Sequence, residues 1–295
     1  MLARRARLWG GVALAALGLA MVGHALPVRA QVAPSYDGED DGEPPRTAPD
    51  AESSRAALPA VARGEMVRIP GGSVVLGAAD PKAPPHERPA FSATLAPYWI
   101  DRLEVSVGDY RRCVQQRRCE TLVPRSSQCT GGLGDDRLPL TCVPFRIAEG
   151  YCRAQGKRLP TEAEWELAAR GPGAGPYPWG ARRPTCARAA TLASEGTSRS
   201  CTGDRPAPVG SRPEGASPYG VLDLAGNAEE WTADWFVANR TAAVGPRAGS
   251  SHVLRGGGWL SPPSATRVTA RSWGSLAEAG PNVGFRCARS DGPRL

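Results

Sequence analysis

Cysteines carry the most chemical potential in this chain, because a thiolate can act as a nucleophile, a redox centre or a metal ligand. The sequence holds eight cysteines, and none of them forms a Cys-x-x-Cys pair. Histidine is scarce, and beyond residue 30 only His86 and His252 occur. We therefore expect no zinc or iron site built on several histidines, and no motif supports a Ser/His/Asp triad on either of the two.

The stretch "LRGGGWLSPPSATRVTARSW", residues 254–273, has the composition of a functional loop. Its three consecutive glycines allow a sharp turn and a close approach to a partner. A tryptophan, several hydroxyl side chains and spaced arginines follow, but no cysteine, histidine or carboxylate does. These residue types leave open whether the stretch carries chemistry or only shapes a surface.

The elements that must hold this stretch are expected to be short. Residues 66–80 alternate apolar and small residues around Gly71-Gly72, which predicts a strand, a turn and a second strand. Residues 91–106 have the aromatic and β-branched content of another strand. A helical pattern begins at Ser106, which can cap a helix, and the loop that follows it is irregular.

Residues 142–171 give the clearest helical signals. Tyr151 and Cys152 share one helical face, and Gly156 ends that helix. Thr161 and Glu164 form a capping box for a second helix, which ends at Gly171. The expected fold class is α+β, with two helices against small twisted sheets and much coil.

The first 30 residues have the pattern of a cleaved signal peptide. An apolar run follows a basic start and is too short for a stable span, and Ala30-Gln31 is a plausible cleavage site. A retained membrane anchor is the alternative. Residues 31–60, rich in Pro, Ala, Ser and acidic residues, predict a disordered linker. One folded domain is expected over residues 61–290, with a tail at 291–295, in a secreted or periplasmic protein that has no membrane span after cleavage.

The formal net charge of +7 does not indicate a nucleic-acid partner. Four of the arginines and no acid fall in the expected signal peptide, so most of the positive excess leaves with it. No block of basic residues with interleaved aromatics occurs. We therefore expect no nucleic-acid binding.

Five motifs, in this order, resemble those of the formylglycine-generating enzyme family, also called the sulfatase-modifying factor family. The resemblance runs from about residue 66 to residue 289 and implies a loop-rich variant of the C-type-lectin-like fold. The motifs are "RLPTEAEWELAARG", "YPWG", "APVGSRPEGASPYGVLDLAGNAEEWTADW", "RGGGW" and "VGFRCAR".

The catalytic members of this family use oxygen to oxidise a sulfatase cysteine to formylglycine, and the resemblance implies two copper-binding cysteines after the Arg-Gly-Gly motif. This sequence has Ser261 at the first position and Thr266 near the second. No cysteine lies between Cys201 and Cys287, so no shift of alignment restores the pair. Hydroxyl groups do not replace thiolates as Cu(I) ligands. We therefore expect no copper, and a protein that is not an enzyme is favoured.

The resemblance also implies a calcium site in the turn "LDLAGNAEEW". Its ligands would be the side chains of Asp223 and Glu230 and the backbone carbonyls of Gly226 and Ala228, an oxygen set that suits a hard cation. The alternative is that the two carboxylates cap turns and pair with arginines. A second calcium site of the family falls near Arg188, and a guanidinium cannot ligate a cation.

An even number of cysteines in an exported protein indicates disulfides. The resemblance implies a Cys152–Cys287 bridge. We expect local pairing for the other six, with a redox-active local pair as the alternative. The expected local bridges are Cys113–Cys119, Cys129–Cys142 and Cys186–Cys201.

Four side chains of residues 254–273 are candidates for a ligand surface: Trp259, Ser261, Arg271 and Trp273. Tryptophans inside the family motifs are more often core residues, and arginines often brace carbonyls, so burial is the alternative for Trp259 and Arg271.

The function that we expect is a non-catalytic binding module for a peptide, a glycan or an envelope partner. A formylglycine-generating oxidase is the alternative, and Ser261 and Thr266 count against it. An oxidase of the same superfamily that forms sulfur–carbon bonds would need an iron site with several histidines, which the chain lacks. A structural part of an envelope assembly is a further alternative.

Overall fold

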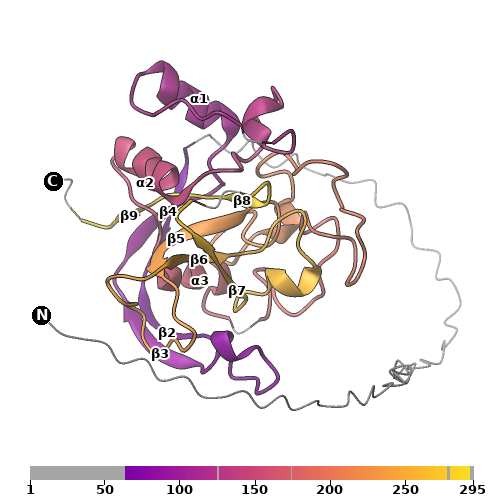
Figure 1. The fold of residues 1–295 in the computed structure, drawn as a ribbon. Helices are drawn as coiled ribbons and strands as arrows, with labels where there is room; N and C mark the ends of the chain where they lie inside the picture. Colours follow the sequence, from indigo (N-terminus) through magenta and orange to yellow (C-terminus); the bar gives the residue numbers. More distant parts are fainter. Residues whose placement is uncertain (1–63, 125, 174, 278–279, 293–295) are drawn as a thin grey trace, which may run out of the picture. The chain divides into compact units, whose positions relative to one another are not determined.

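In this computed structural model, the described residues of the chain form three small sheets (Figure 1). The structure describes residues 64–124, 126–173, 175–277 and 280–292. These residues belong to one unit, Ala57–Leu295. The expected signal peptide, the expected linker and the last three residues of the expected tail lie outside the described residues.

The first two sheets contain the four earliest strands of the chain, and the last strand, β9, joins one of them. β1 (Met66–Ile69), β4 (Tyr98–Asp101) and β9 (Ala288–Ser290) form an antiparallel sheet in the order β1-β4-β9. β2 (Gly72–Leu76) and β3 (Phe91–Leu95) form a separate antiparallel ribbon. The two strands predicted around Gly71-Gly72 are thus present, and they belong to different sheets. The single strand expected over residues 91–106 is wrong, because Pro97, which has no N–H to donate, separates β3 from β4.

The third sheet has the order β7-β6-β5-β8. It consists of β5 (Glu229–Trp235), β6 (Ser251–Arg255), β7 (Arg271–Ser275) and β8 (Val283–Gly284). β8 runs parallel to β5, whereas β6 pairs antiparallel with both of its neighbours. Residues 254–273 therefore start in β6, pass through a loop and return in β7.

The described residues form three α-helices, so the expected number of two is wrong. The additional helix is α1 (Val107–Gln115), which begins where the helical pattern begins. Ser106 and Asp109 form its capping box, and the ring of Tyr110 stacks 5.7 Å from that of Tyr151 in α2 (Phe145–Ala154). A short helix of nine residues is stabilised here by its cap and by packing on a neighbour.

The signals for α3 (Glu162–Arg170) are confirmed. Thr161 and Glu164 form the predicted capping box, and the helix ends at Gly171, whose φ is 61°. The fold is α+β with small sheets and much coil, as the sequence predicts.

Two buried clusters flank the four-stranded sheet. On the side of α1 and α2, Trp231 and Leu254 pack with Tyr151 of α2 and with Phe285. On the α3 side, Trp165 packs with residues of β1 and β4. Figure 1 shows α1 and α2 at one end of the domain and the β2–β3 ribbon at the other. No helix within the described ranges is long and apolar enough to cross a membrane.

Candidate functional site

The loop after β6 brings the two expected catalytic positions together. Gly257 has a φ of 59°, and a Cβ atom added to it would lie 3.2 Å from Ser261 Cβ and 3.2 Å from Thr266 Cγ2. Thr266 ends the short 3-10 helix η4 (Pro263–Thr266). The side chains of Ser261 and Thr266 therefore both lie close to Gly257, although four residues separate them in the sequence.

Both hydroxyl groups maintain the conformation of this loop. Ser261 Oγ accepts hydrogen bonds from the N–H of Gly258 (3.0 Å) and from Asn282 Nδ2 (2.9 Å). Thr266 is fully buried and donates to the carbonyl of Pro263 (2.8 Å). The sequence did not indicate Asn282, which also accepts from the N–H of Leu260.

No cysteine of the described residues is free. The structure joins the same four pairs that the sequence analysis expected, including Cys152–Cys287, which closes a separation of 135 residues. Thiolates for a soft metal are therefore missing both at the loop and elsewhere in the described parts of the chain.

A buried network of arginines and glutamates lies beneath the loop. Arg255 donates to Glu166 (2.9 Å) and to the carbonyls of residues 268–270. Arg271 makes a two-point contact with Glu162 (2.6 and 3.1 Å), and Arg240 pairs with both glutamates. Burial alone would raise the pKa of Glu166, but the surrounding arginines lower it below its ordinary value.

Sequence reasoning missed the two glutamates of this network. The available signal was their spacing of four residues in the predicted helix, which places Glu162 and Glu166 on one face. These contacts join α3 to β6, to β7 and to the carbonyls of residues 268–270, so the network braces the loop.

Of the four proposed ligand-surface residues, Trp273 is the most exposed, at 50 %. Its ring stacks on Phe236 at 4.1 Å and meets His86 edge-on at 5.7 Å, and the Arg271 guanidinium lies 5.0 Å from the Phe236 ring. Trp259 is 1 % exposed and donates to the carbonyl of Pro281. Trp259 and Arg271 are thus buried and used internally, as the alternative reading held, and Trp273 presents an aromatic surface.

The turn expected to bind calcium has an unusual backbone. Asp223 and Asn227 adopt positive φ values of 58° and 70°. Asp223 Oδ2 accepts from the N–H of Gly210 (2.6 Å). Both oxygens of the fully buried Glu230 accept hydrogen bonds from Arg286, and one also accepts from Trp165 Nε1 (2.8 Å).

A third carboxylate, Glu104, joins this turn and was not indicated by the sequence. It accepts from Asn227 Nδ2 (2.7 Å) and from the N–H of Ala228 (2.8 Å) and is 2 % exposed. Burial, then repulsion from Asp223 and Glu230, raises the pKa of Glu104 well above its ordinary value. Burial also raises the pKa of Asp223. Three buried carboxylates therefore lie near Arg286, and Arg212 is a second guanidinium close enough to lower the pKa of Asp223.

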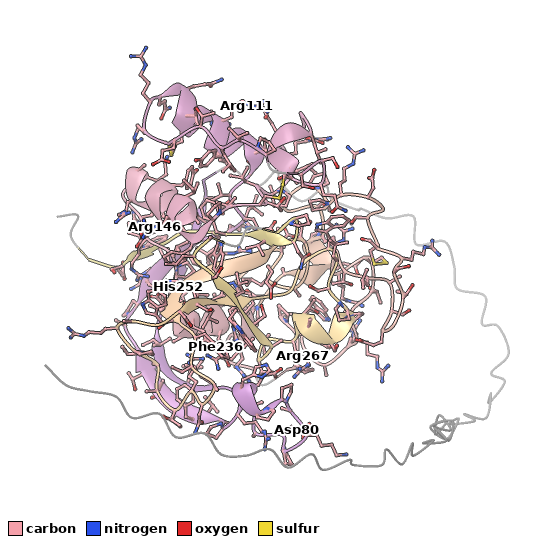
Figure 2. All side chains as sticks on the ribbon, viewed as in Figure 1. Asp80, Arg111, Arg146, Phe236, His252 and Arg267 are labelled. Carbon is pink, nitrogen blue, oxygen red and sulfur yellow. A yellow bond between two sulfur atoms is a disulfide. The ribbon has the colours of Figure 1, made fainter. Side chains whose placement is uncertain are left out.

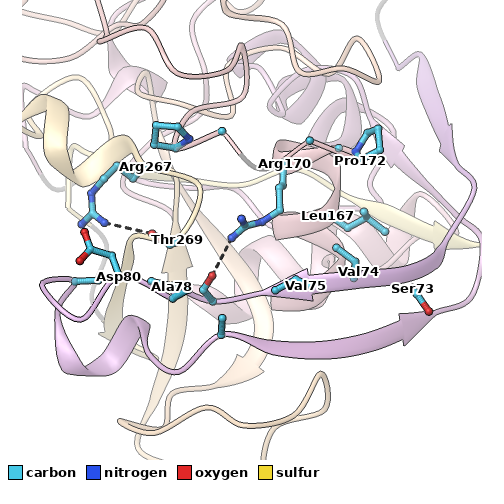
Figure 3. Close-up of a pocket in the computed structure, with 18 of the residues that line it drawn as sticks. Ser73, Val74, Val75, Ala78, Asp80, Leu167, Arg170, Pro172, Arg267 and Thr269 are labelled. Atoms are coloured by element: carbon cyan, nitrogen blue, oxygen red, sulfur yellow. Dashed lines mark hydrogen bonds between the residues drawn. The ribbon is translucent and has the colours of Figure 1, made fainter.

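A groove of about 900 Å³ lies between β2 and the C-terminal end of α3 (Figure 3). Val74 and Val75 line one side, and Leu167 and Arg170 line the other. Arg267, from the loop after η4, closes one end. Figure 2 places Arg267 and Asp80 at the end of the domain opposite to Arg111 of α1.

Residues 53–291 match the family described as "Sulfatase-modifying factor enzyme 1-like domain", which is most of the chain. The chain belongs to the sulfatase-modifying factor family. A mouse (Mus musculus) relative named inactive C-alpha-formylglycine-generating enzyme 2 is 31 % identical over 77 % of this chain and 86 % of its own length. The formylglycine-generating enzyme of Thermomonospora curvata is 30 % identical over 81 % of this chain and 97 % of its own length.

Solved structures agree with this sulfatase-modifying factor fold. PvdO from Pseudomonas aeruginosa superposes with a TM-score of 0.62 at 28 % identity, covering 76 % of this chain and 94 % of PvdO. Treponema denticola variable protein 1 reaches a TM-score of 0.54 at 19 % identity, which concerns the fold alone.

The family resemblance implies copper and calcium, and the residues of this chain suit the two metals to different degrees. Copper does not fit, because the two positions carry hydroxyls and no described cysteine is free. The turn supplies hard oxygens, the donor type that calcium prefers, but no group of three or more His, Cys, Asp or Glu side chains among the described residues is placed to hold a metal ion. Glu230 would have to share its carboxylate between that ion and Arg286.

Proposed function

We propose that this protein is an exported, non-catalytic member of the sulfatase-modifying factor family that acts as a binding module. The observation that carries the proposal is the pair Ser261 and Thr266. These residues occupy adjacent places in the loop and use their hydroxyls for internal hydrogen bonds. The mouse relative named inactive C-alpha-formylglycine-generating enzyme 2 supports the same conclusion.

The partner of this module would be a peptide, a glycan or another envelope protein. Trp273 supplies an exposed aromatic surface on β7 and stacks on Phe236, whose ring in turn lies against the Arg271 guanidinium. Aromatic side chains of this kind provide contact area with little loss of conformational entropy. Calcium at the Asp223 turn is proposed as a structural part of the module.

An oxidase assay tests the proposal. A peptide with a Cys-x-Pro-x-Arg segment, incubated with copper and oxygen, is expected to gain no formylglycine, because no thiolate pair is available to hold Cu(I). The Thermomonospora curvata enzyme serves as the positive control. The double variant Ser261→Cys/Thr266→Cys should bind Cu(I), which the unmodified chain does not. Turnover by the unmodified chain would establish the alternative function, a formylglycine-generating oxidase.

An intact-mass measurement tests export and the state of the cysteines together. The protein recovered from the periplasm or the medium is expected to begin at Gln31, with all eight cysteines oxidised. Alkylation without reduction should add no mass. A protein that keeps residues 1–30 in the membrane would contradict the export proposal, and two alkylated cysteines would reveal a labile bridge.

A further inference from the structure

β2 is an edge strand that borders the groove beside α3, which we call the β2 groove. The strand pairs with β3 alone, and the consecutive residues Ser73, Val74 and Val75 all line the groove. Neighbouring side chains in a strand point to opposite faces. A cavity that touches three residues in a row therefore runs along the edge of the strand, and no residue of β3 lines it.

The backbone of β2 is unpaired along this edge. In an antiparallel pair, alternate residues exchange hydrogen bonds with the partner strand, and the N–H and C=O groups of the others point away from it. Beyond β3, no described residue donates to or accepts from the backbone of residues 72–76. The next residue, Gly77, is engaged, since it donates to Glu166 and accepts from Arg170. The edge therefore offers donors and acceptors spaced for a third strand.

The side chains around this edge leave room for a strand. Val75 is 53 % exposed, although natural edge strands are usually protected by charge, proline or a bulge. Across the groove, Leu167 is followed by a loop of glycines and prolines whose short side chains leave the space open (Figure 3).

We propose that the β2 groove binds an extended peptide segment of a partner protein by β-strand addition. The proposal rests on the proposed binding function and names its partner class. Main-chain hydrogen bonds to β2 provide affinity. Val74 and Leu167, which pack in one cluster, select apolar side chains at alternate positions, and Val75 faces the positions between them. The five residues of β2 span about 17 Å, so the contact covers about five peptide residues.

The composition of residues 31–60 argues against self-occupation of this groove. That segment contains five prolines and only two β-branched residues, Val32 and Thr47. Proline removes the donors that strand addition needs, and β-branched residues favour extended pairing. A partner with alternating β-branched residues fits the edge better.

Amide hydrogen exchange on the chain that begins at Gln31 tests the proposal. The probe is acetyl-Thr-Val-Thr-Val-Glu-Val-Thr-Val-amide at saturating concentration, which should slow exchange in residues 72–76 about tenfold or more. The controls are two versions of this peptide, each methylated at one alternate set of backbone nitrogens. The version methylated on the edge that faces β2 should lose the effect. Equal protection by both controls, or no protection at all, would overturn strand addition.

A matched pair of surface variants separates the groove from general effects. Val75→Lys places a charge on the β2 edge and should weaken binding of the probe about tenfold, because an apolar contact is lost and a lysine blocks the edge. Val123→Lys makes the same change at a residue that is 75 % exposed and outside the groove, and it should leave binding unchanged. Equal effects of the two variants would refute the assignment.

The outcomes also distinguish this inference from the proposed function. If a synthetic peptide of residues 31–60 protects β2 and the probe does not, the groove is occupied by the chain itself and the inference fails. If the probe fails while a glycan array shows binding that Trp273→Ala abolishes, the inference fails and the binding function stands. Formylglycine formation by the unmodified chain would remove the proposed function, whatever the groove binds.

Discussion

At the scale of single residues, the hydroxyls of the loop after β6 are hydrogen-bonded internally, and the carboxylates of the Asp223 turn are buried close together. Ser261 and Thr266 are fixed by hydrogen bonds, whereas Glu104 and Asp223 are buried where ionisation is unfavourable. A carboxyl group with a raised pKa binds its proton more tightly in the folded than in the unfolded chain. Its contribution to stability is therefore present at low pH and is lost as the pH rises through the folded pKa.

Asp223→Asn tests this charge balance in the presence of a metal chelator. The asparagine keeps an oxygen for the Gly210 N–H and tolerates the positive φ of 58°. Removing the carboxylate should make the variant more stable than the unmodified chain at pH 8. Its stability should also fall less steeply as the pH rises above 4, and one proton accounts for at most about 1.4 kcal/mol per pH unit.

Urea unfolding at several pH values, with Glu214→Gln as the control, gives the measurement. Glu214 has an exposed side chain in a long contact with Arg188 (3.7 Å), so its loss should shift stability little at any pH. If Asp223→Asn is less stable than the unmodified chain at pH 8, the carboxylate is ionised and favourably paired, and the assigned pKa direction is wrong.

At the scale of elements, the sequence indicated local features such as helix caps, but it did not indicate which strands pair with one another. The capping box of α3 lies within four residues, so the sequence alone indicated it correctly. By contrast, only Pro70 and Gly71 separate β1 from β2, yet the two strands join different sheets, because their partners lie later in the chain. Local periodicity contains no information about such partners.

The same limit explains which site residues were missed. The hydrogen bond between Asn227 and Glu104 joins residues that are 123 positions apart. Glu104 lies in a connection without regular structure, where no pattern marks it. The positions of Ser261 and Thr266, in contrast, followed from their motif, and the structure shows them on either side of Gly257. The spacing of the motifs therefore indicated the loop, whereas the site residues outside the motifs could be identified only from the three-dimensional structure.

At the scale of the whole domain, the Asp223 turn connects distant parts of the chain. Glu104 follows β4, Glu230 belongs to β5, and Arg286 lies between β8 and β9 beside the Cys152–Cys287 bridge. Arg286 also donates to the carbonyls of Asp101, Arg102 and Leu222. A change of charge at this junction should therefore act on the stability of the entire domain.

Calcium should raise the melting temperature of the whole domain, because a divalent cation offsets the excess of buried carboxylate. At ten times the dissociation constant, binding to the folded state alone contributes about 1.4 kcal/mol, or about 3–6 °C for a domain of this size. Calorimetry with calcium and then with a chelator measures the shift, and Asp223→Asn should reduce it. Magnesium is the control, because it accepts an irregular oxygen set poorly. An equal melting temperature in calcium and in chelator would mean that nearby arginines and bound protons balance the three carboxylates without a metal ion.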